Sequence, residues 1–372
     1  MKAPRLLKSS LLMATVLLLS AGCQTLPEST NDQSNSEAAT TKTDTTAAAQ
    51  RGYYSPVIKD DRYALNDARG LSVGNTSQAN RENTERSTYR MLTESFPPDD
   101  YQLKEGAVIS KDQLSKWLGA KTKDNSEGLN PEKSDSGKAN DFEPHYLNTI
   151  FEYDLMGNKQ ENSDKLQAIS LTLVLNSEDQ ATSDSKMVTI DQKTAIKQGK
   201  SIAQEILNRL RQQKDYQEIP IQFYLFYNAP SDNLAGGSIV SSTQVSPDSS
   251  SFGDWEDNNA QHIAFGVDKA PNQEDTTKFD RYRQSVVTLF PELSGISGVG
   301  LYQDSKLSQL TLTIHTPFDG YSETVALMEQ AIAQANSTFD KNLNINIKIQ
   351  GPSGNTASAQ RTSGNDFSMT IF

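Results

Sequence analysis

Hydrophobic residues alternate with polar ones in two stretches of similar sequence, residues 162–173 (NSDKLQAISLTL) and 303–314 (QDSKLSQLTLTI). Each is a polar turn that runs into an alternating segment, a pattern typical of a half-buried β-strand. A second alternating segment follows each of them, at 221–227 and at 345–349. The recurrence of the same order of segments indicates an internal repeat.

Helical periodicity separates the two strands in each copy. Apolar residues recur at intervals of three and four within 202–210 and within 325–339, which predicts an amphipathic helix at each place. Ser322 is the expected N-cap of the second helix, because its hydroxyl can accept from a free backbone N–H. Basic residues near the end of the first helix suit the negative end of its dipole.

Two further strands are expected in each copy. One precedes the first alternating segment, at 149–155 and at 297–302, and one closes each unit, at 238–245 and at 367–372. The predicted fold class is therefore α+β: two tandem related β-β-α-β-β units, each a mainly antiparallel or mixed sheet with a helix on one face. Clean alternation favours a sheet whose other face is exposed to water.

Composition divides the chain into four parts. These are a signal peptide at 1–22, a disordered tether at 23–52, a first α+β repeat at 53–257 with extra helices at 78–96 and 111–118, and a second repeat at 258–372. The tether contains no aromatic residue and one large aliphatic residue, Leu26. It cannot bury enough apolar surface to offset its ordering entropy. A flexible chain of this length spans about 30 Å.

The first residues have the layout of a secretory signal. Lys2, Arg5 and Lys8 precede an apolar run, Leu11–Gly22, which is shorter than the roughly 20 residues that a membrane-spanning helix needs. The run ends Leu19, Ser20, Ala21, Gly22, Cys23, which resembles the lipobox of bacterial lipoproteins, although leucine is more usual at the position of Ser20.

Cys23 is therefore the expected lipidation site. Lipoprotein processing enzymes would cut between Gly22 and Cys23 and leave the cysteine with S-diacylglycerol and N-acyl groups. The alternative is an ordinary signal-peptide cysteine without a role. Cys23 is the only cysteine in the chain, so it cannot form an internal disulfide, and lipidation explains its presence. The expected location is the extracytoplasmic face of the cell membrane.

The charge of the chain excludes one class of partner. The formal net charge is −12, and loss of Lys2, Arg5 and Lys8 with the signal peptide removes three positive charges, which gives −15. An acidic chain is repelled by phosphate backbones, so we expect no nucleic acid partner. Anionic lipid head groups repel it too, so the acyl chains alone would hold it on the membrane.

A search for catalytic, metal or cofactor motifs finds none. The three histidines, His145, His262 and His315, lack the spacing of metal ligands. There is no G-x-S-x-G elbow, and Gly236-Gly237-Ser238 is interpreted as a turn that leads into a strand. The glycine-rich 295–300 lacks the lysine and the following helix of a phosphate loop. We therefore expect no catalytic residue, no metal and no cofactor.

Acidic clusters are the remaining candidates for chemistry. Asp60-Asp61, Asp99-Asp100 and Asp254–Asp257 could bind calcium or provide acid–base groups for a glycan. None has the ligand spacing of a calcium loop, so solvated loop charge is the favoured interpretation. Trp255 lies within the last cluster, where it could stack on a sugar, cover a cation or anchor the segment between the two units. We favour the anchoring role.

Four segments together carry a family resemblance. They are KQGKSIAQEILNRLR at 197–211 with Ile219-Pro220-Ile221, ARGL at 68–71, FPPDDY at 96–101, and GLNP at 128–131. The chain from Tyr53 to the C-terminus resembles the CamS sex-pheromone lipoproteins of Gram-positive bacteria. In that family a short apolar peptide, cut from the signal sequence, is secreted and sensed by plasmid-bearing cells, which respond by conjugation. The resemblance implies no catalytic residues.

The matching peptide here is Val16, Leu17, Leu18, Leu19, Ser20, Ala21 and Gly22. It contains neither phenylalanine nor isoleucine and ends in glycine, which departs from the family's pheromone. A peptide of different specificity and an inactive product both remain open.

Three functions are therefore compatible with the sequence. The favoured one is a lipid-anchored, non-enzymatic surface protein whose signal peptide is a pheromone precursor. The second is a binding module, in which a sheet face or the cleft between the units holds a wall fragment or a partner protein. The third is a wall-acting hydrolase with acidic residues around Trp255.

Overall fold

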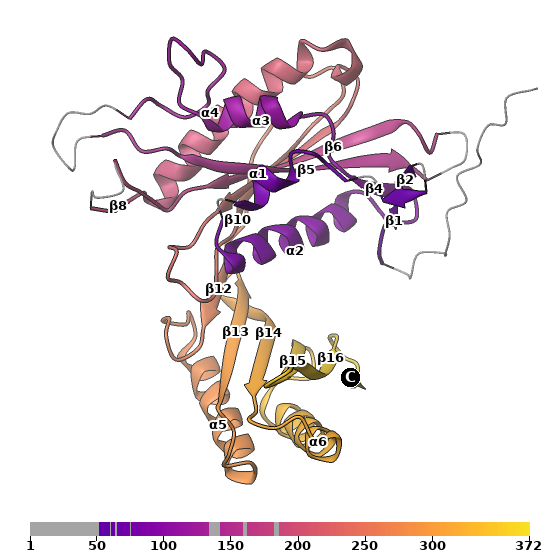
Figure 1. Ribbon diagram of the computed structural model, residues 1–372, viewed down its shortest axis with the longest axis vertical. Coiled ribbons are helices and arrows are strands. Elements are labelled where there is room, and N and C mark those ends of the chain that lie inside the picture. The colour runs from indigo at the N-terminus through magenta and orange to yellow at the C-terminus, as the bar shows by residue number, and fades with distance from the viewer. Residues whose placement is uncertain are drawn as a thin grey trace, which may run out of the picture. The chain divides into compact units, whose positions relative to one another are not determined.

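Two large β-sheets, the helices packed on them and two short hairpins make up the described part of the chain (Figure 1). The computed structural model describes residues 52–372 except 60, 64, 75, 134–141, 159–161 and 182–185. The expected signal peptide and almost all of the expected tether lie outside the described residues.

The first sheet has seven strands in the order β1-β4-β5-β6-β9-β10-β11. The strands are β1 (Ser55–Pro56), β4 (Tyr101–Glu105), β5 (Leu147–Gly157), β6 (Leu166–Leu175), β9 (Ile221–Tyr227), β10 (Ser238–Val245) and β11 (Glu256–Asp257). The pairs β1–β4 and β6–β9 are parallel, and the other pairs are antiparallel.

The second sheet has six strands in sequence order. They are β12 (Ala260–Ala264), β13 (Gly295–Gln303), β14 (Lys306–His315), β15 (Asn344–Gly351), β16 (Gly354–Arg361) and β17 (Ser368–Ile371). The pair β14–β15 is parallel, and the other pairs are antiparallel.

The two sheets share one pairing pattern. In each, an antiparallel hairpin (β5–β6 or β13–β14) is followed by a parallel neighbour (β9 or β15) and then by an antiparallel strand (β10 or β16). The parallel step requires a crossover, and a long helix provides it: α4 (Gln192–Arg211) in the first sheet and α6 (Tyr321–Thr338) in the second. The predicted α+β fold class is confirmed.

The remaining elements are short or lie outside the repeated pattern. The helices are α1 (Arg69–Gly74), α2 (Gln78–Ser95), α3 (Lys111–Leu118), α5 (Gln273–Leu289) and the 3-10 turn η1 (Lys214–Tyr216). Two small hairpins are β2 (Ile58–Lys59) with β3 (Arg62–Tyr63), and β7 (Glu178–Asp179) with β8 (Val188–Thr189).

Side chains of residues just before the helices fix several helix starts. Ser77, Ser110 and Asp191 accept hydrogen bonds from backbone N–H groups in the first turns of α2, α3 and α4. The predicted N-cap Ser322 is wrong. α6 begins at Tyr321, so Ser322 lies inside the helix, and Gly320 is the N-cap, without a side-chain hydrogen bond.

The expected wet face is found in the second sheet only. β14 and β15 alternate between buried positions, which face α6 and the core, and more exposed ones. In the first sheet, β6 and β9 are buried at nearly every position. Two core clusters explain this difference: one includes residues of α3 and α4, and the other lies where α2 packs against β6 and β10 (Figure 1).

One predicted strand has a different role. Residues 367–372 were expected to close the second repeat, but the equivalent of β10 is β16, at 354–361. The predicted segment forms β17, an edge strand beside β16.

Candidate functional site

The residues expected to carry the main function lie outside the described structure. They are the lipidation site Cys23, the cleavage position Gly22 and the peptide at 16–22. Asp60 also lies outside. Of the other acidic candidates, Asp61, Asp99 and Asp100 are exposed, as the interpretation as solvated charge requires.

The three histidines have separate surroundings. His315 is exposed at the end of β14, and His145 lies just before β5. His262 lies in β12. Within the described ranges, no group of three His, Cys, Asp or Glu side chains could hold a metal ion.

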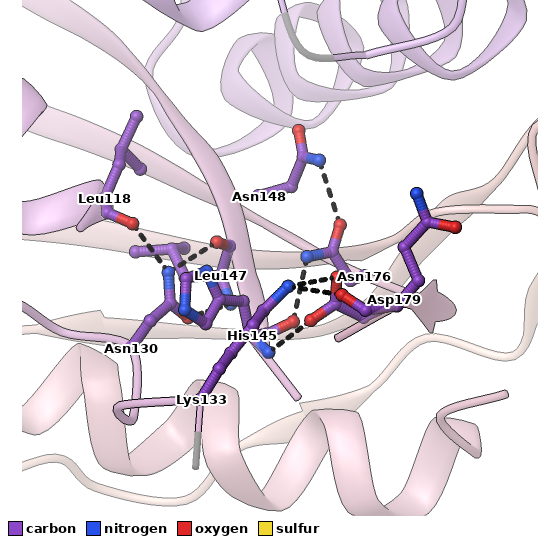
Figure 2. Close-up of polar contacts among 9 residues, drawn as sticks. Leu118, Asn130, Lys133, His145, Leu147, Asn148, Asn176 and Asp179 are labelled. Atoms are coloured by element: carbon purple, nitrogen blue, oxygen red, sulfur yellow. Dashed lines mark hydrogen bonds and ion pairs between the residues drawn. The ribbon is translucent and has the colours of Figure 1, made fainter. Parts of the chain in front are cut away.

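His145 belongs to a polar network at the start of β5 (Figure 2). Its backbone N–H donates to Asp179 Oδ2 over 2.8 Å. Lys133 Nζ donates to Asp179 Oδ1 and to the Gln180 carbonyl, each over 2.8 Å. Burial lowers the pKa of His145, and the Lys133 charge lowers it further, so the ring is neutral at pH 7.

Asparagine side chains complete this network. Asn130 Nδ2 donates to the carbonyls of Leu118 (2.8 Å) and Leu147 (2.9 Å), and its Oδ1 accepts from Leu147 N (2.9 Å) (Figure 2). Asn176 Nδ2 donates to the His145 carbonyl, also over 2.9 Å. These groups are engaged with backbone, so the network holds α3 against the start of β5 and is structural.

Trp255 packs inward. Its half-buried ring lies 5.1 Å from that of Phe252, and both rings pack against the core of the first sheet. Lys200 Nζ lies 5.3 Å from the centre of the indole. Asp254 and Glu256 are exposed beside it. The tryptophan therefore anchors the segment that leads out of the first sheet, and the hydrolase interpretation loses the aromatic platform that motivated it.

A groove of about 260 Å3 offers a better candidate site. α2 lines it with Arg86 and Arg90, and the wet face of the second sheet contributes Thr311, Thr313 and Lys348. These sheet residues have intermediate burial, as expected for the face that no helix of the second repeat covers. Sequence reasoning placed a candidate ligand site in this type of location, but named none of these residues.

Asparagines of α2 position one wall of the groove. Asn80 Oδ1 accepts from the N–H groups of Ala229 (3.0 Å) and Gly237 (2.7 Å). Asn83 Nδ2 donates to the Ala235 carbonyl over 2.7 Å. Because both asparagines lie on one face of α2, they fix the loop that leads into β10.

His262 joins the groove to a smaller cavity of about 80 Å3 beside it. Its Nδ1 is 2.9 Å from the Gly237 carbonyl and 2.9 Å from Ser238 Oγ. A carbonyl can only accept, so Nδ1 carries the proton. The ring therefore cannot use this nitrogen to take a proton from Ser238, and the pair lacks the geometry of an activated nucleophile.

The charged side chains that line the groove favour one class of ligand. Arg86 forms an ion pair with Glu82 (3.5 Å), whereas Arg90 and Lys348 have no ion-pair partner among the described residues. Burial lowers the pKa of His262 to about 4, so the ring is neutral at pH 7. Two unpaired cations beside hydroxyl and amide groups suit an anionic ligand.

Sequence reasoning missed the contact between Ser238 and His262. They lie 24 residues apart in strands of different sheets. The available signals were the glycine pair before Ser238 and the place of His262 in a short strand. Neither specifies a partner.

Comparisons with known proteins agree on one family. The model of the family described as CamS sex pheromone cAM373 precursor matches residues 63–366. No curated protein matches the sequence.

Solved structures that are similar to this chain include two sex pheromone precursors. A sex pheromone precursor from Lactobacillus salivarius subsp. salivarius UCC118 has 28% identity and a TM-score of 0.81, and the match covers 88% of this chain and 98% of that one. The C-terminal domain of the sex pheromone staph-cAM373 precursor from Staphylococcus aureus has 22% identity and a TM-score of 0.69, with 80% and 99% coverage, and supports the fold alone. On the family match, this chain belongs to the CamS sex pheromone cAM373 precursor family, which is not a known enzyme family.

Proposed function

We propose that this chain is a lipoprotein anchored at the outer face of the cell membrane through Cys23, with a non-enzymatic folded part and a signal peptide that is processed to a secreted pheromone. The observation that carries the proposal is the run of small residues before Cys23 in a chain of a pheromone-precursor family. None of the described helices is long and apolar enough to cross a bilayer.

Anchoring is tested by Cys23→Ala. The variant should lose labelling by a radioactive fatty acid and move from the membrane fraction to the medium or to an unprocessed precursor. Thr25→Ala, two residues downstream, is the matched control and should behave like wild type. Labelled, membrane-bound Cys23→Ala protein would overturn the proposed anchor.

Pheromone activity is tested separately. Synthetic VLLLSAG and spent medium from expressing cells should each induce conjugation in a plasmid-bearing recipient. A peptide of the same composition in scrambled order is the control. If neither peptide nor medium induces a response in recipients of several plasmid types, the peptide is not a pheromone, whereas the lipid anchor is unaffected by that outcome.

The groove supports a second function, binding of an anionic wall fragment. Arg90 and Lys348 line it without ion-pair partners among the described residues, although the chain as a whole is acidic. A ligand that binds only the folded protein raises the melting temperature. Soluble wall glycopeptides and a glycerol-phosphate oligomer should therefore do so at low salt. Arg90→Gln and Lys348→Gln should reduce the shift, and exposed Lys306→Gln should not. Equal shifts in all three variants would rule out this groove.

A further inference from the structure

Two carboxylates are buried side by side on β5. Glu152 and Asp154 lie two residues apart, on the same face of the strand, and are 9% and 2% exposed. Glu152 accepts from the N–H groups of Val108 (2.7 Å) and Ile109 (2.9 Å). Asp154 Oδ2 accepts from Ala107 N (2.9 Å). Three consecutive amides thus bind the pair.

The site of the pair favours the protonated form of both carboxyls. Burial raises the pKa of both carboxyls, and for Glu152 the nearby charge of Asp154 adds to the effect. Two carboxylates in one buried site cannot both ionise readily, which favours a proton shared between Glu152 and Asp154 in a hydrogen bond. Among the described residues, Asp154 Oδ1 has no other hydrogen-bond partner, which leaves it as the oxygen that faces this proton.

An amine lies opposite. Lys104 on β4 pairs in register with Asp154, and its Nζ is 3.9 Å from Asp154 Oδ2. The Lys104 side chain is 27% exposed, so it is largely withdrawn from water. The two carboxyls also affect Tyr216, whose pKa is raised by burial and further by their charges. The Lys104 amine, the Asp154 carboxyl and the proton donor Glu152 therefore lie together between β4 and β5.

We propose that Lys104 and Asp154 condense to an intramolecular amide bond between β4 and β5, with Glu152 as the proton relay. The reaction starts from the ion pair when the Lys104 ammonium gives one proton to the carboxyl pair. This leaves a neutral amine and two protonated carboxyls.

The amine nitrogen then attacks Asp154 Cγ. The carbonyl electrons move to Oδ2, where the Ala107 N–H stabilises the developing negative charge. Glu152 gives its proton to the departing Oδ1 hydroxyl and takes one from the nitrogen. Oδ1 leaves as water, and Glu152 remains protonated. Atoms and charge balance without an oxidant or a co-reactant.

The bond would give the fold a covalent staple that its single cysteine cannot provide. It would close the loop between residues 104 and 154 and join β4 to its neighbour. A cross-link of this kind stabilises chiefly by restricting the unfolded chain. β4 is also the strand on which β1, the first strand of the sheet, is paired. A force applied to the N-terminal end of the chain would therefore act on β4, which the covalent bond would prevent from separating from β5.

Peptide mapping of the purified full chain by mass spectrometry tests the proposal. Wild type should yield a branched tryptic peptide, in which trypsin fails to cut after Lys104 and the mass is one water below the sum of the two parts. Lys104→Arg keeps the charge but cannot condense, and Glu152→Gln removes the relay; both should yield linear peptides. Glu127→Gln, at a side chain that is 44% exposed, is the matched control and should remain branched.

Thermal unfolding adds a second measurement. Wild type should melt at a higher temperature than Lys104→Arg, and near-ultraviolet circular dichroism checks that both are folded. Recovery of only linear peptides from folded wild type would overturn the proposal, and the contact would then be an ordinary ion pair. A cross-link that persists in Glu152→Gln would overturn the role of Glu152.

Discussion

The hydroxyls of Thr88 and Thr172 form a hydrogen bond of 2.8 Å between α2 and β6, and neither residue is exposed to solvent. This contact shows how a helix with a polar inner face can cover a sheet. The buried residues of α2 include Asn80, Thr84 and Thr88, and Leu92 is the only large apolar residue among them. Hydrogen bonds therefore replace much of the apolar packing expected at such an interface.

Thr88→Val should destabilise the protein by about 1–3 kcal/mol, because the hydroxyl of Thr172 loses its partner in a buried site. The double variant with Thr172→Val should recover most of this loss, since neither polar group then remains. Urea unfolding of both single variants and the double variant measures the coupling. If the two single losses simply add, the hydrogen bond contributes nothing specific.

Asn130 makes a second prediction. The side chain is buried and satisfies three backbone groups, on Leu118 and Leu147. Asn130→Ala should lower the free energy of unfolding by about 3 kcal/mol or more, because these groups would lose partners inside the protein. Exposed Asn342→Ala is the control and should change stability by less than about 0.5 kcal/mol. Equal effects of the two substitutions would contradict the structural role of the network.

In the second repeat, a buried cation plays a role comparable to that of Asn130. Arg361 of β16 is 2% exposed and donates to Asn336 Oδ1 (2.9 Å) and to the carbonyls of Asp340 (2.6 Å) and Leu343 (3.3 Å). Lysine cannot reproduce this planar set of donors. Arg361→Lys should therefore cost about 3 kcal/mol of stability in urea unfolding. Exposed Arg281→Lys is the control, and a loss no larger than in that control would refute the prediction.

His262 predicts a pH dependence. Its pKa falls from the ordinary 6.5 to about 4 on folding, chiefly through burial. Between these values the unfolded chain binds the proton and the folded one does not, so protonation favours unfolding. The contribution is complete above pH 6.5 and is lost as pH falls towards 4, by up to about 3 kcal/mol.

His262→Asn keeps a donor for the Gly237 carbonyl but removes the titration. Its stability, measured by urea unfolding at several pH values, should fall less steeply between pH 6.5 and 4 than that of wild type. Parallel curves for the two proteins would show that His262 does not carry this effect.

The repeat was predictable because its strands alternate strongly. Large aliphatic residues such as Ile169 and Leu310 enter the core at every second position. β16 was missed because its inward residues, Ala357 and Ala359, are small and its neighbours are polar. Buried and more exposed positions do alternate in β16, but the difference in hydrophobicity between alanine and its polar neighbours is small.

The failure to predict that a helix covers the second face of the first sheet had a different cause. The sequence predicted a helix at 78–96 but not its place, since its inner face is mostly polar. The contacts between Ser238 and His262, and between Lys104 and Asp154, join residues distant in sequence. Such pairs depend on strand register, which local patterns in a single sequence do not determine.

The most direct test of the proposed lipid anchor is mass spectrometry of the mature N-terminus, isolated from membranes of expressing cells. The proposed anchor predicts a peptide that begins at Cys23 and carries diacylglycerol and an N-acyl chain. A mature protein whose N-terminal peptide still contains the bond between Gly22 and Cys23, or begins with an unmodified Cys23, would contradict it.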